Sequence, residues 1–311
     1  MVKLAAAGFG EVAREVVKAI LAEGHHEITI LSRKDAPSNL LPDLKWTKVN
    51  YEDKKQLVKA LKGMHTVLSF IVTHLDIGCV AQINLIDTCV EVGVKRFSPS
   101  EIDLNGSQFY DNKIQIRRYL ENLNKPKKVL EYSMFFPGVF MNYLAPPEKM
   151  GAGLSYIKPF IDFEYCRAIL PEQTDITVSF STIQDLGRVV AKALDYEREW
   201  PVLGGIAASK TSISDLLQVG ERIRGKPFSI ERIKQSDLEA DKFTTSWAPE
   251  LNHPTIAVDT RKAVAKRYLR FAMLGLAKGA WDIPDVWNQL LPEVEFTKLE
   301  DFLQATWDKA E

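Results

Sequence analysis

A glycine-rich turn near the start of the chain has the residue types that bind phosphate groups. Residues 7–13, AGFGEVA, follow an apolar strand pattern, open a helical pattern and form a G-x-G-x-x-A sequence. Gly8 would allow the tight turn, Gly10 would let a pyrophosphate approach the backbone, and Ala13 would keep the helix close to the sheet. Amide groups at a helix N-terminus favour anions. We expect a dinucleotide to contact Gly8, Phe9, Gly10, Glu11 and Val12; the alternative is an ordinary strand-to-helix turn.

Basic residues stand where the second strand pattern ends. Proteins specific for NAD place a carboxylate here to bind the ribose diol, whereas this chain has Ser32, Arg33 and Lys34. An arginine can bind the adenosine 2′-phosphate with two hydrogen bonds, and a carboxylate would repel it. These residues at the end of the second strand therefore predict binding of NADP(H) rather than NAD(H). The alternative is that Arg33 is an ordinary surface charge.

Lys113 is the candidate for acid–base chemistry. It opens a helical pattern in FYDNKIQIRRYLEN, after the fifth strand pattern and its loop. A lysine there could donate a proton or hold a substrate oxygen near a hydride donor. Tyr110 lies three residues upstream, on the same face if both are helical, and is a candidate substrate contact. A solvated helix lysine is the alternative.

A tyrosine–lysine pair with the spacing of short-chain dehydrogenases occurs elsewhere in the chain. Tyr51 and Lys55 are four residues apart, the spacing at which a lysine lowers the pKa of a tyrosine proton donor. The pair lies in the turn after the third strand pattern, away from the expected nicotinamide end. We interpret it as a coincidence.

The elements that position these residues alternate between strand and helix patterns. This alternation predicts an α/β protein with a Rossmann-type, doubly wound parallel sheet and a ligand at the carboxyl ends of the strands. Strands are expected at 3–7, 27–32, 45–50, 66–72, 95–98 and 129–135, and helices at 11–23, 54–62, 81–92 and 112–124.

The second half is less regular and predicts a smaller C-terminal α/β substrate lobe. A strand pattern at 175–183 leads into a helix at 186–197, and Ser212 with Asp215 has the spacing of a capping box before a helical segment at 213–225. We expect residues 1–150 to form the dinucleotide-binding domain, 151–311 mainly the substrate lobe, and 175–205 to return to the first domain.

Composition and charge limit the classes of partner that the protein is expected to bind. Lysine and arginine number 40 against 41 acidic residues, so no overall field favours nucleic acid or an anionic membrane. The run at 125–128 is expected to be a solvated loop. Three cysteines without CxxC spacing predict neither disulfides nor a metal site. No apolar stretch approaches a membrane span, so we expect a cytoplasmic protein, with a homodimer as an open alternative. The four tryptophans at 247, 281, 287 and 307 fit core packing better than an aromatic pocket.

Several longer segments resemble a known family. The chain is similar to NmrA-like and isoflavone reductase-like atypical short-chain dehydrogenases, in particular the fungal isoflavone reductase-like branch, and the similarity covers nearly its whole length. The segments that carry it are AGFGEVA, ILSRK, GVKRFSPSEI, YDNKIQIRRYLE, LEYSMFFPGVFMNYL, DLGRVVAKALDYEREWPVLGGI and GERIRGKPF.

The resemblance implies an NADPH-dependent reductase that acts on an aromatic metabolite. By this similarity the catalytic lysine falls on Lys113, which would also contact the cofactor, and the 2′-phosphate contacts fall on Arg33 and Lys34. The segment 135–140 would border nicotinamide and substrate, and two residues after the fourth strand would flank the dinucleotide. The implied cofactor contacts are Pro137, Phe70 and Ile71, and the implied substrate contacts are Phe136 and Phe140.

One motif departs from the family pattern. The family loop is usually G-x-x-G-x-x-G, and alignment on the following helix puts Ala7 and Ala13 on the outer glycines, with Gly10 retained. Gly8 restores the G-x-G form.

The leading hypothesis is reduction of a C=C, C=O or C=N bond in an aromatic or polycyclic specialised metabolite. Two alternatives stay open: a redox-inactive NADP-sensing regulator, and a redox-neutral cyclase or isomerase that uses bound NADP⁺.

Overall fold

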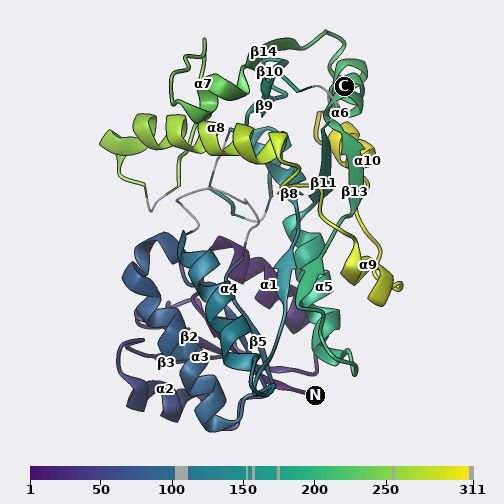
Figure 1. Cartoon of the computed structure of the whole chain (residues 1–311). Helices are drawn as coiled ribbons and strands as arrows, with labels where there is room; N and C mark the ends of the chain where they lie inside the picture. Colours follow the sequence, from purple (N-terminus) through teal and green to yellow (C-terminus); the bar gives the residue numbers. More distant parts are fainter. Residues whose placement is uncertain (102–110, 152, 156–157, 174–175, 254–255, 308–311) are drawn as a thin grey trace.

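The computed structural model describes residues 1–101, 111–151, 153–155, 158–173, 176–253 and 256–307. The chain forms a Rossmann part that contains the N-terminus and a smaller lobe that stands on it (Figure 1). Helix α8, Arg261–Ala277, runs along the side of the lobe that faces the Rossmann part.

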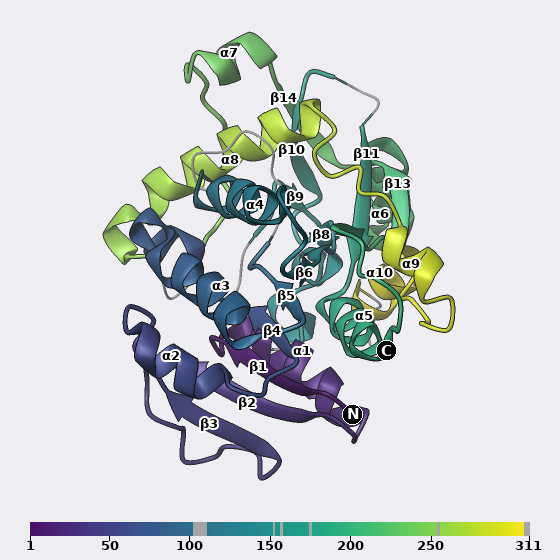
Figure 2. The same ribbon diagram turned by 60° about the horizontal axis from the view of Figure 1, so that its bottom comes forward.

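A six-stranded parallel sheet forms the centre of the Rossmann part. Its strand order is β3-β2-β1-β4-β5-β6. This is the doubly wound order: successive strands are added on one side of β1 as far as β3, and from β4 onward on its other side. Figure 2 shows the strands spread in this order. The strands are β1 Lys3–Ala7, β2 Glu27–Ser32, β3 Leu44–Lys48, β4 Thr66–Ser69, β5 Arg96–Ser98 and β6 Glu131–Tyr132. The helices of this part are α1 Glu11–Ala22, α2 Lys54–Leu61, α3 Val80–Val92 and α4 Asp111–Asn124.

The last strand of this sheet continues into a second short sheet. Directly after β6, Ser133 donates its backbone N–H to Phe97 at 3.1 Å, and Met134 donates to Val202 at 3.0 Å. Strand β7, Met134–Phe136, therefore pairs with β12, Leu203–Gly205, instead of β5. This change of partner carries the chain from the Rossmann sheet toward the lobe.

Helix α5, Ile183–Asp195, packs against α1 on the Rossmann part. Its start is fixed by a capping box: the Thr182 hydroxyl accepts the Asp185 N–H at 3.0 Å, and the Asp185 carboxylate accepts the Thr182 N–H at 2.7 Å. Its buried side chains join those of β1 and α1 in one core. Helix α5 thus packs on the Rossmann part, whereas the preceding strand at 177–181 packs in the lobe core, and the predicted return of 175–205 to the first domain stays a prediction.

The lobe has its own core between two three-stranded sheets and their helices. Ser212 begins α6 as the sequence predicts, since its hydroxyl accepts the Asp215 N–H at 3.0 Å. Trp281 and Trp287 are buried, and Trp247 and Trp307 pack on the lobe core. The other elements are β8 Val139–Phe140, β9 Ile161–Asp162, β10 Arg167–Pro171, β11 Thr177–Ser181, β13 Ser209–Ser212, α6 Ile213–Arg224, β14 Ser229–Ile233, α7 Gln235–Glu239, α9 Val286–Leu290 and α10 Leu299–Trp307.

The sheet confirms the predicted Rossmann-type α/β fold. The single strand predicted at 129–135 is wrong: it is two strands, β6 and β7, because the chain changes its pairing partner at Ser133 and Met134. Other corrections concern element ends. Strand β4 stops at Ser69, three residues before the predicted end, because residues 70–72 turn into a 3-10 helix at Thr73–Leu75. Helix α5 begins at Ile183 rather than 186, because the capping box lies earlier than the apolar pattern suggests. The boundary near residue 150 stays a prediction.

Candidate functional site

The turn after β1 is held against the neighbouring strands through its backbone. Gly8 donates its N–H to the carbonyl of Leu31 at 2.9 Å, and Phe70 donates to Ala7 at 2.8 Å. The φ angle of Gly8 is +99°, and a Cβ added there would lie 3.0 Å from the carbonyl oxygen of Phe70. Only glycine fits this position without strain. Phe70 and Ile71 thus border the loop, and their contact with a dinucleotide stays a prediction.

The start of α1 offers open backbone donors. Gly10 is its N-cap residue, in an extended conformation, and no side chain caps the helix there. The first N–H groups of a helix have no partner within the helix. No atom lies within 4 Å of the position that a Cβ on Gly10 would take, among the described residues. A phosphate group therefore has both donors and room at this point.

The basic tip of β2 lies beside the loop with both cationic side chains exposed. Ser32 accepts the backbone N–H of Lys34 at 3.1 Å, and the indole of Trp46 donates to the Lys34 carbonyl at 3.0 Å. The ring of Phe9 meets Trp46 edge-on at 5.7 Å between centroids. The backbone is thus fixed while Arg33 and Lys34 stay accessible to an anion.

Tyr51 has a structural role under the same tip. Its hydroxyl donates to the carbonyl of Leu31 at 2.8 Å, and burial raises the pKa of the phenol. Lys55 is exposed. A buried phenol with a raised pKa that is bonded to a backbone carbonyl does not fit the tyrosine–lysine acid pair, and this agrees with its interpretation as a coincidence.

Glu11 joins the phosphate loop to the segment after residue 150. One of its carboxylate oxygens accepts the Ser155 N–H at 2.9 Å, and the other accepts the Ser155 hydroxyl. Tyr143 lies nearby: burial, then the charge of Glu11 and the presence of Tyr268, raise the pKa of its phenol. The Glu11 carboxylate, in the first turn of α1, is therefore hydrogen-bonded to Ser155 of the lobe.

Lys113 lies in the first turn of α4 and is only 5% exposed. The side chain of the preceding Asn112 donates to the carbonyls of Thr73 and Asp76 at 2.7 and 2.8 Å, which fastens the turn after β4 to the start of α4. Burial, followed by the charges of His253 and Lys113, lowers the pKa of His74 in that turn. Lys113 is thus withdrawn from solvent at the carboxyl edge of the sheet, and its role as a proton donor stays a prediction.

The segment 136–140 crosses from the Rossmann part to the lobe. Gly138 has a φ of +66°, and a Cβ there would lie 2.2 Å from the carbonyl oxygen of Ser179, so the chain passes β11 in direct contact. Pro137 is buried before this turn. The Arg117 guanidinium lies 5.2 Å from the centre of the Phe136 ring and bonds the buried Glu101 carboxylate at 2.8 Å.

The buried Phe140 links the two parts of the site through apolar contacts. It belongs to the core that includes Leu68, and the partly buried rings of Phe9, Phe70 and Tyr143 pack on this core. The expected cofactor contacts at Phe9 and Phe70 and the expected substrate contact at Phe140 thus share one apolar cluster. Phe136 lies in the core on the other side of the sheet.

Several residues near the carboxyl edge of the sheet were not predicted from the sequence. Tyr143 stands three residues beyond Phe140 in a motif already singled out, so its position was a usable signal. Tyr268 lies on α8, and burial raises the pKa of its phenol to about 12. Ser155 and Tyr268 lie in the irregular second half, where no periodic pattern relates them to the loop. Tyr110 lies outside the described residues, so its predicted substrate contact stays a prediction.

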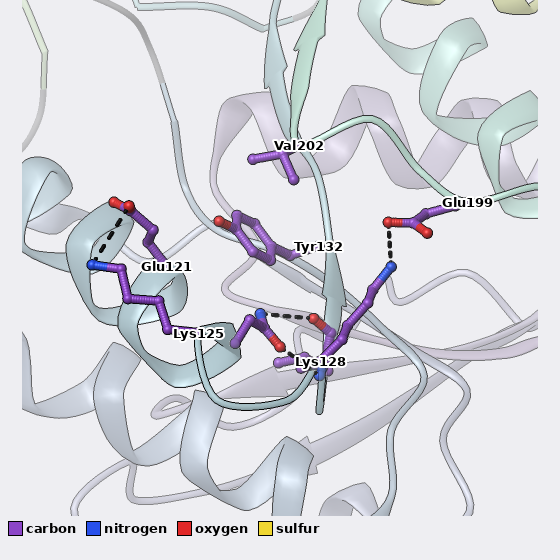
Figure 3. A pocket seen from close by; sticks show the side chains of 8 residues that line it. Glu121, Lys125, Lys128, Tyr132, Glu199 and Val202 are labelled. Atoms are coloured by element: carbon purple, nitrogen blue, oxygen red, sulfur yellow. Dashed lines mark hydrogen bonds and ion pairs between the residues drawn. The ribbon is translucent and has the colours of Figure 1, made fainter.

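A cavity of about 280 Å³ lies at the opposite edge of the sheet, between the end of α4 and the beginning of β6. Figure 3 shows Lys125 pointing to Glu121 and Lys128 to Glu199, with Tyr132 between these pairs. These contacts fit the predicted solvated loop at 125–128. The cavity shares no residue with the predicted site.

Among the described residues, the three cysteines are buried and unpaired, and no helix combines the length and apolarity that a membrane span needs.

Comparisons with known proteins agree with this architecture. The model of the NmrA-like family matches residues 5–303. Oxidoreductase swnN of Metarhizium robertsii is 25% identical over 97% of this chain and 96% of its own length. The NADPH complex of an NADPH-dependent quinone oxidoreductase from Escherichia coli superposes with a TM-score of 0.69 at 17% identity, covering 98% of this chain and 100% of the other.

A second solved structure, AtPrR2 with NADP⁺ and (+)pinoresinol, superposes with a TM-score of 0.68 at 19% identity and covers 98% of both chains. At these identities the superpositions show the fold. The family match spans nearly the whole sequence, including the loop, the Lys113 helix and the lobe. The chain therefore belongs to the NmrA-like family.

Proposed function

We propose that this protein is an NADPH-dependent reductase of an aromatic or polycyclic specialised metabolite. One observation carries the proposal most directly: Lys113, 5% exposed, lies at the same carboxyl edge of the sheet as the glycine loop and the Arg33 tip. A protein that only bound the dinucleotide would need the loop and the tip but not a buried lysine at the other end of that edge.

The residues of the dinucleotide end fit NADP(H). Gly8 makes a turn that no other residue could make without strain, Gly10 leaves space at open helix N–H groups, and Arg33 and Lys34 present two cations where the adenosine phosphate would lie. The carboxylate of Glu11 would repel the pyrophosphate, but Ser155 engages both of its oxygens. The related oxidoreductase and the NADP(H) complexes of fold neighbours support the same cofactor.

The role of this chain in the reaction follows from its own groups. Bound NADPH would supply a hydride to a C=C, C=O or C=N bond. Reduction leaves negative charge on the substrate, and Lys113 would neutralise it by donating a proton from its ammonium group. The apolar cluster around Phe140, with Tyr143 and Tyr268 beside it, would hold a ring system and exclude water from the reacting bond.

A fold neighbour that binds NADP⁺ together with (+)pinoresinol supports an aromatic small-molecule substrate. We also propose that the enzyme works in the cytoplasm. A homodimer is part of the same proposal, and light scattering of the purified chain would test it.

The test is turnover with a panel of aromatic and polycyclic substrates, using NADPH that carries deuterium at the transferred position. A product that gains one deuterium from the cofactor and one hydrogen from the proton donor establishes reduction. Lys113→Ala should lower kcat by about 10²- to 10⁴-fold while NADPH binding persists. The matched control is Arg118→Ala, an exposed position on the same helix. Products of unchanged mass would replace the proposal with redox-neutral catalysis, and NADPH binding without turnover of any substrate would replace it with a sensor.

A further inference from the structure

A cluster of two histidines and one aspartate lies outside the predicted site. His25 and His26 form the turn between α1 and β2, and Asp195 is the last residue of α5. These two helices lie side by side in Figures 1 and 2. The cluster is at the edge where the strands begin, opposite the loop and Lys113, so the proposed reaction does not use it.

The possible ligand atoms of the three side chains lie close together. The Nε2 atoms of His25 and His26 lie 2.8 and 3.5 Å from the same Asp195 Oδ2 oxygen, and the ligand atoms of all three residues lie within 4.8 Å of one another. Zinc binds imidazole nitrogen and carboxylate oxygen at about 2.0–2.2 Å, so two ligands of a tetrahedral zinc ion are roughly 3.4 Å apart. The observed separations bracket that distance.

The hydrogen bonding of His25 directs its Nε2 atom at the carboxylate. Its Nδ1 lies 2.8 Å from the carbonyl oxygen of Glu23, and because a carbonyl can only accept, Nδ1 carries the proton. In neutral His25 the Nε2 atom that faces Asp195 is unprotonated, and in protonated His25 the Nε2–H donates to the carboxylate. A cation must lie between the two atoms, either a proton or a metal ion. A backbone carbonyl on the far nitrogen is also how metal-binding histidines are oriented.

His26 provides the second, independent observation. Its side chain is fully enclosed, and its Nε2 has no hydrogen-bond partner among the described residues although it points toward Asp195. A buried polar atom without a partner destabilises the folded state. The neighbouring Lys192 is paired with Glu23 at 2.7 Å, so the carboxylate of Asp195 is left for the two imidazoles.

We propose that His25 Nε2, His26 Nε2 and Asp195 bind a divalent transition-metal ion of the zinc type at the surface. Water would complete the coordination, since nitrogen and carboxylate ligands suit zinc, copper and nickel. Binding would connect the α1–β2 turn with the end of α5, 170 residues apart in the sequence. It would move the remaining proton of His26 to Nδ1 and break the 3.4 Å contact from Val2 N–H. The ion would have a structural role, remote from the hydride donor.

The experiment uses full-length protein without a histidine tag, freed of metal by a chelator. Calorimetric titration with zinc chloride should show one binding site. The Tm of the protein should rise by about 5 °C when the zinc concentration is about a hundred times the Kd. Cobalt should give the intense visible absorption of low-coordinate Co²⁺.

Variants of two cluster residues and one control variant test whether the cation between His25 and Asp195 is a metal ion or a proton. His25→Gln and Asp195→Asn should each abolish the zinc-dependent rise in Tm, and NADPH affinity should stay within twofold. Because His25 is exposed, its variant should fold even if Asp195→Asn does not. His65→Gln, at a histidine outside the cluster, should keep the full response. The absence of zinc binding to the wild-type protein, or an equal response in His25→Gln, would overturn the proposal.

Discussion

The two ends of the carboxyl edge are built in different ways. The dinucleotide end comes from two stretches close in sequence, 7–13 and 32–34, joined through neighbouring strands. At the Lys113 end, the side chain of Asn112 joins the turn at 73–76 to the start of α4, and the chain near Gly138 contacts Ser179 of β11. The first end therefore follows from local backbone requirements, whereas the second depends on tertiary contacts. Variants at the first end should change stability or cofactor affinity, and variants at the second should change kcat.

The largest effect in this comparison is expected at Gly8. Gly8→Ala forces a side chain into a φ of +99° and against the carbonyl oxygen of Phe70, so unfolding free energy should fall by about 3 kcal/mol. Gly10→Ala is the matched control, because its φ is −79° and its Cβ meets no described atom within 4 Å. That variant should keep the wild-type Tm and bind NADPH about tenfold more weakly. Equal Tm values for both variants in thermal unfolding would show that Gly8 is not strained.

The tip of β2 should show the next largest effect. Arg33→Asp replaces the proposed 2′-phosphate contact with a repulsive charge, and hydrogen bonds to charged groups contribute about 1.5–3 kcal/mol. The Kd for NADPH should rise about 10- to 100-fold, while the Kd for NADH stays nearly constant. Calorimetry with both cofactors measures this. Lys18→Asp, an exposed site on α1, controls for the change in net charge. Equal losses for NADPH and NADH would contradict the 2′-phosphate assignment.

These two ends also differ in how far the sequence could predict them. The order of strands and helices, the glycine loop and the cap at Ser212 follow local rules, so residues 3–34 and α6 were predicted almost to the residue. The contacts of Asn112 and of Glu11 with Ser155 join segments that no periodicity relates. Phe136 has the same apolar character as Phe140, yet the two belong to different cores, because the chain turns at Gly138 between them.

Asn112 tests the Lys113 end with a smaller effect. Asn112→Ala removes both hydrogen bonds that fasten the turn after β4 to the start of α4. The displaced turn should misplace Lys113 and lower kcat about tenfold, an energy of about 1.4 kcal/mol. The Kd for NADPH should stay within twofold, because the glycine loop is untouched. Steady-state kinetics and cofactor titration separate the two quantities, and Asn122→Ala is the control on the same helix. A loss of NADPH affinity without a change in kcat would remove the distinction between the ends.

The smallest effect should come from the contact that connects the dinucleotide end to the lobe. Ser155→Ala removes a hydroxyl bond to Glu11 but keeps the backbone N–H bond, so unfolding free energy should fall by about 1 kcal/mol. In a Glu11→Ala background the same change should cost almost nothing, a coupling that urea unfolding of the double-mutant cycle measures. The exposed Ser236→Ala should stay within about 0.5 kcal/mol of wild type. Additive effects would mean that the two residues are not coupled and that this contact does not connect the dinucleotide end to the lobe.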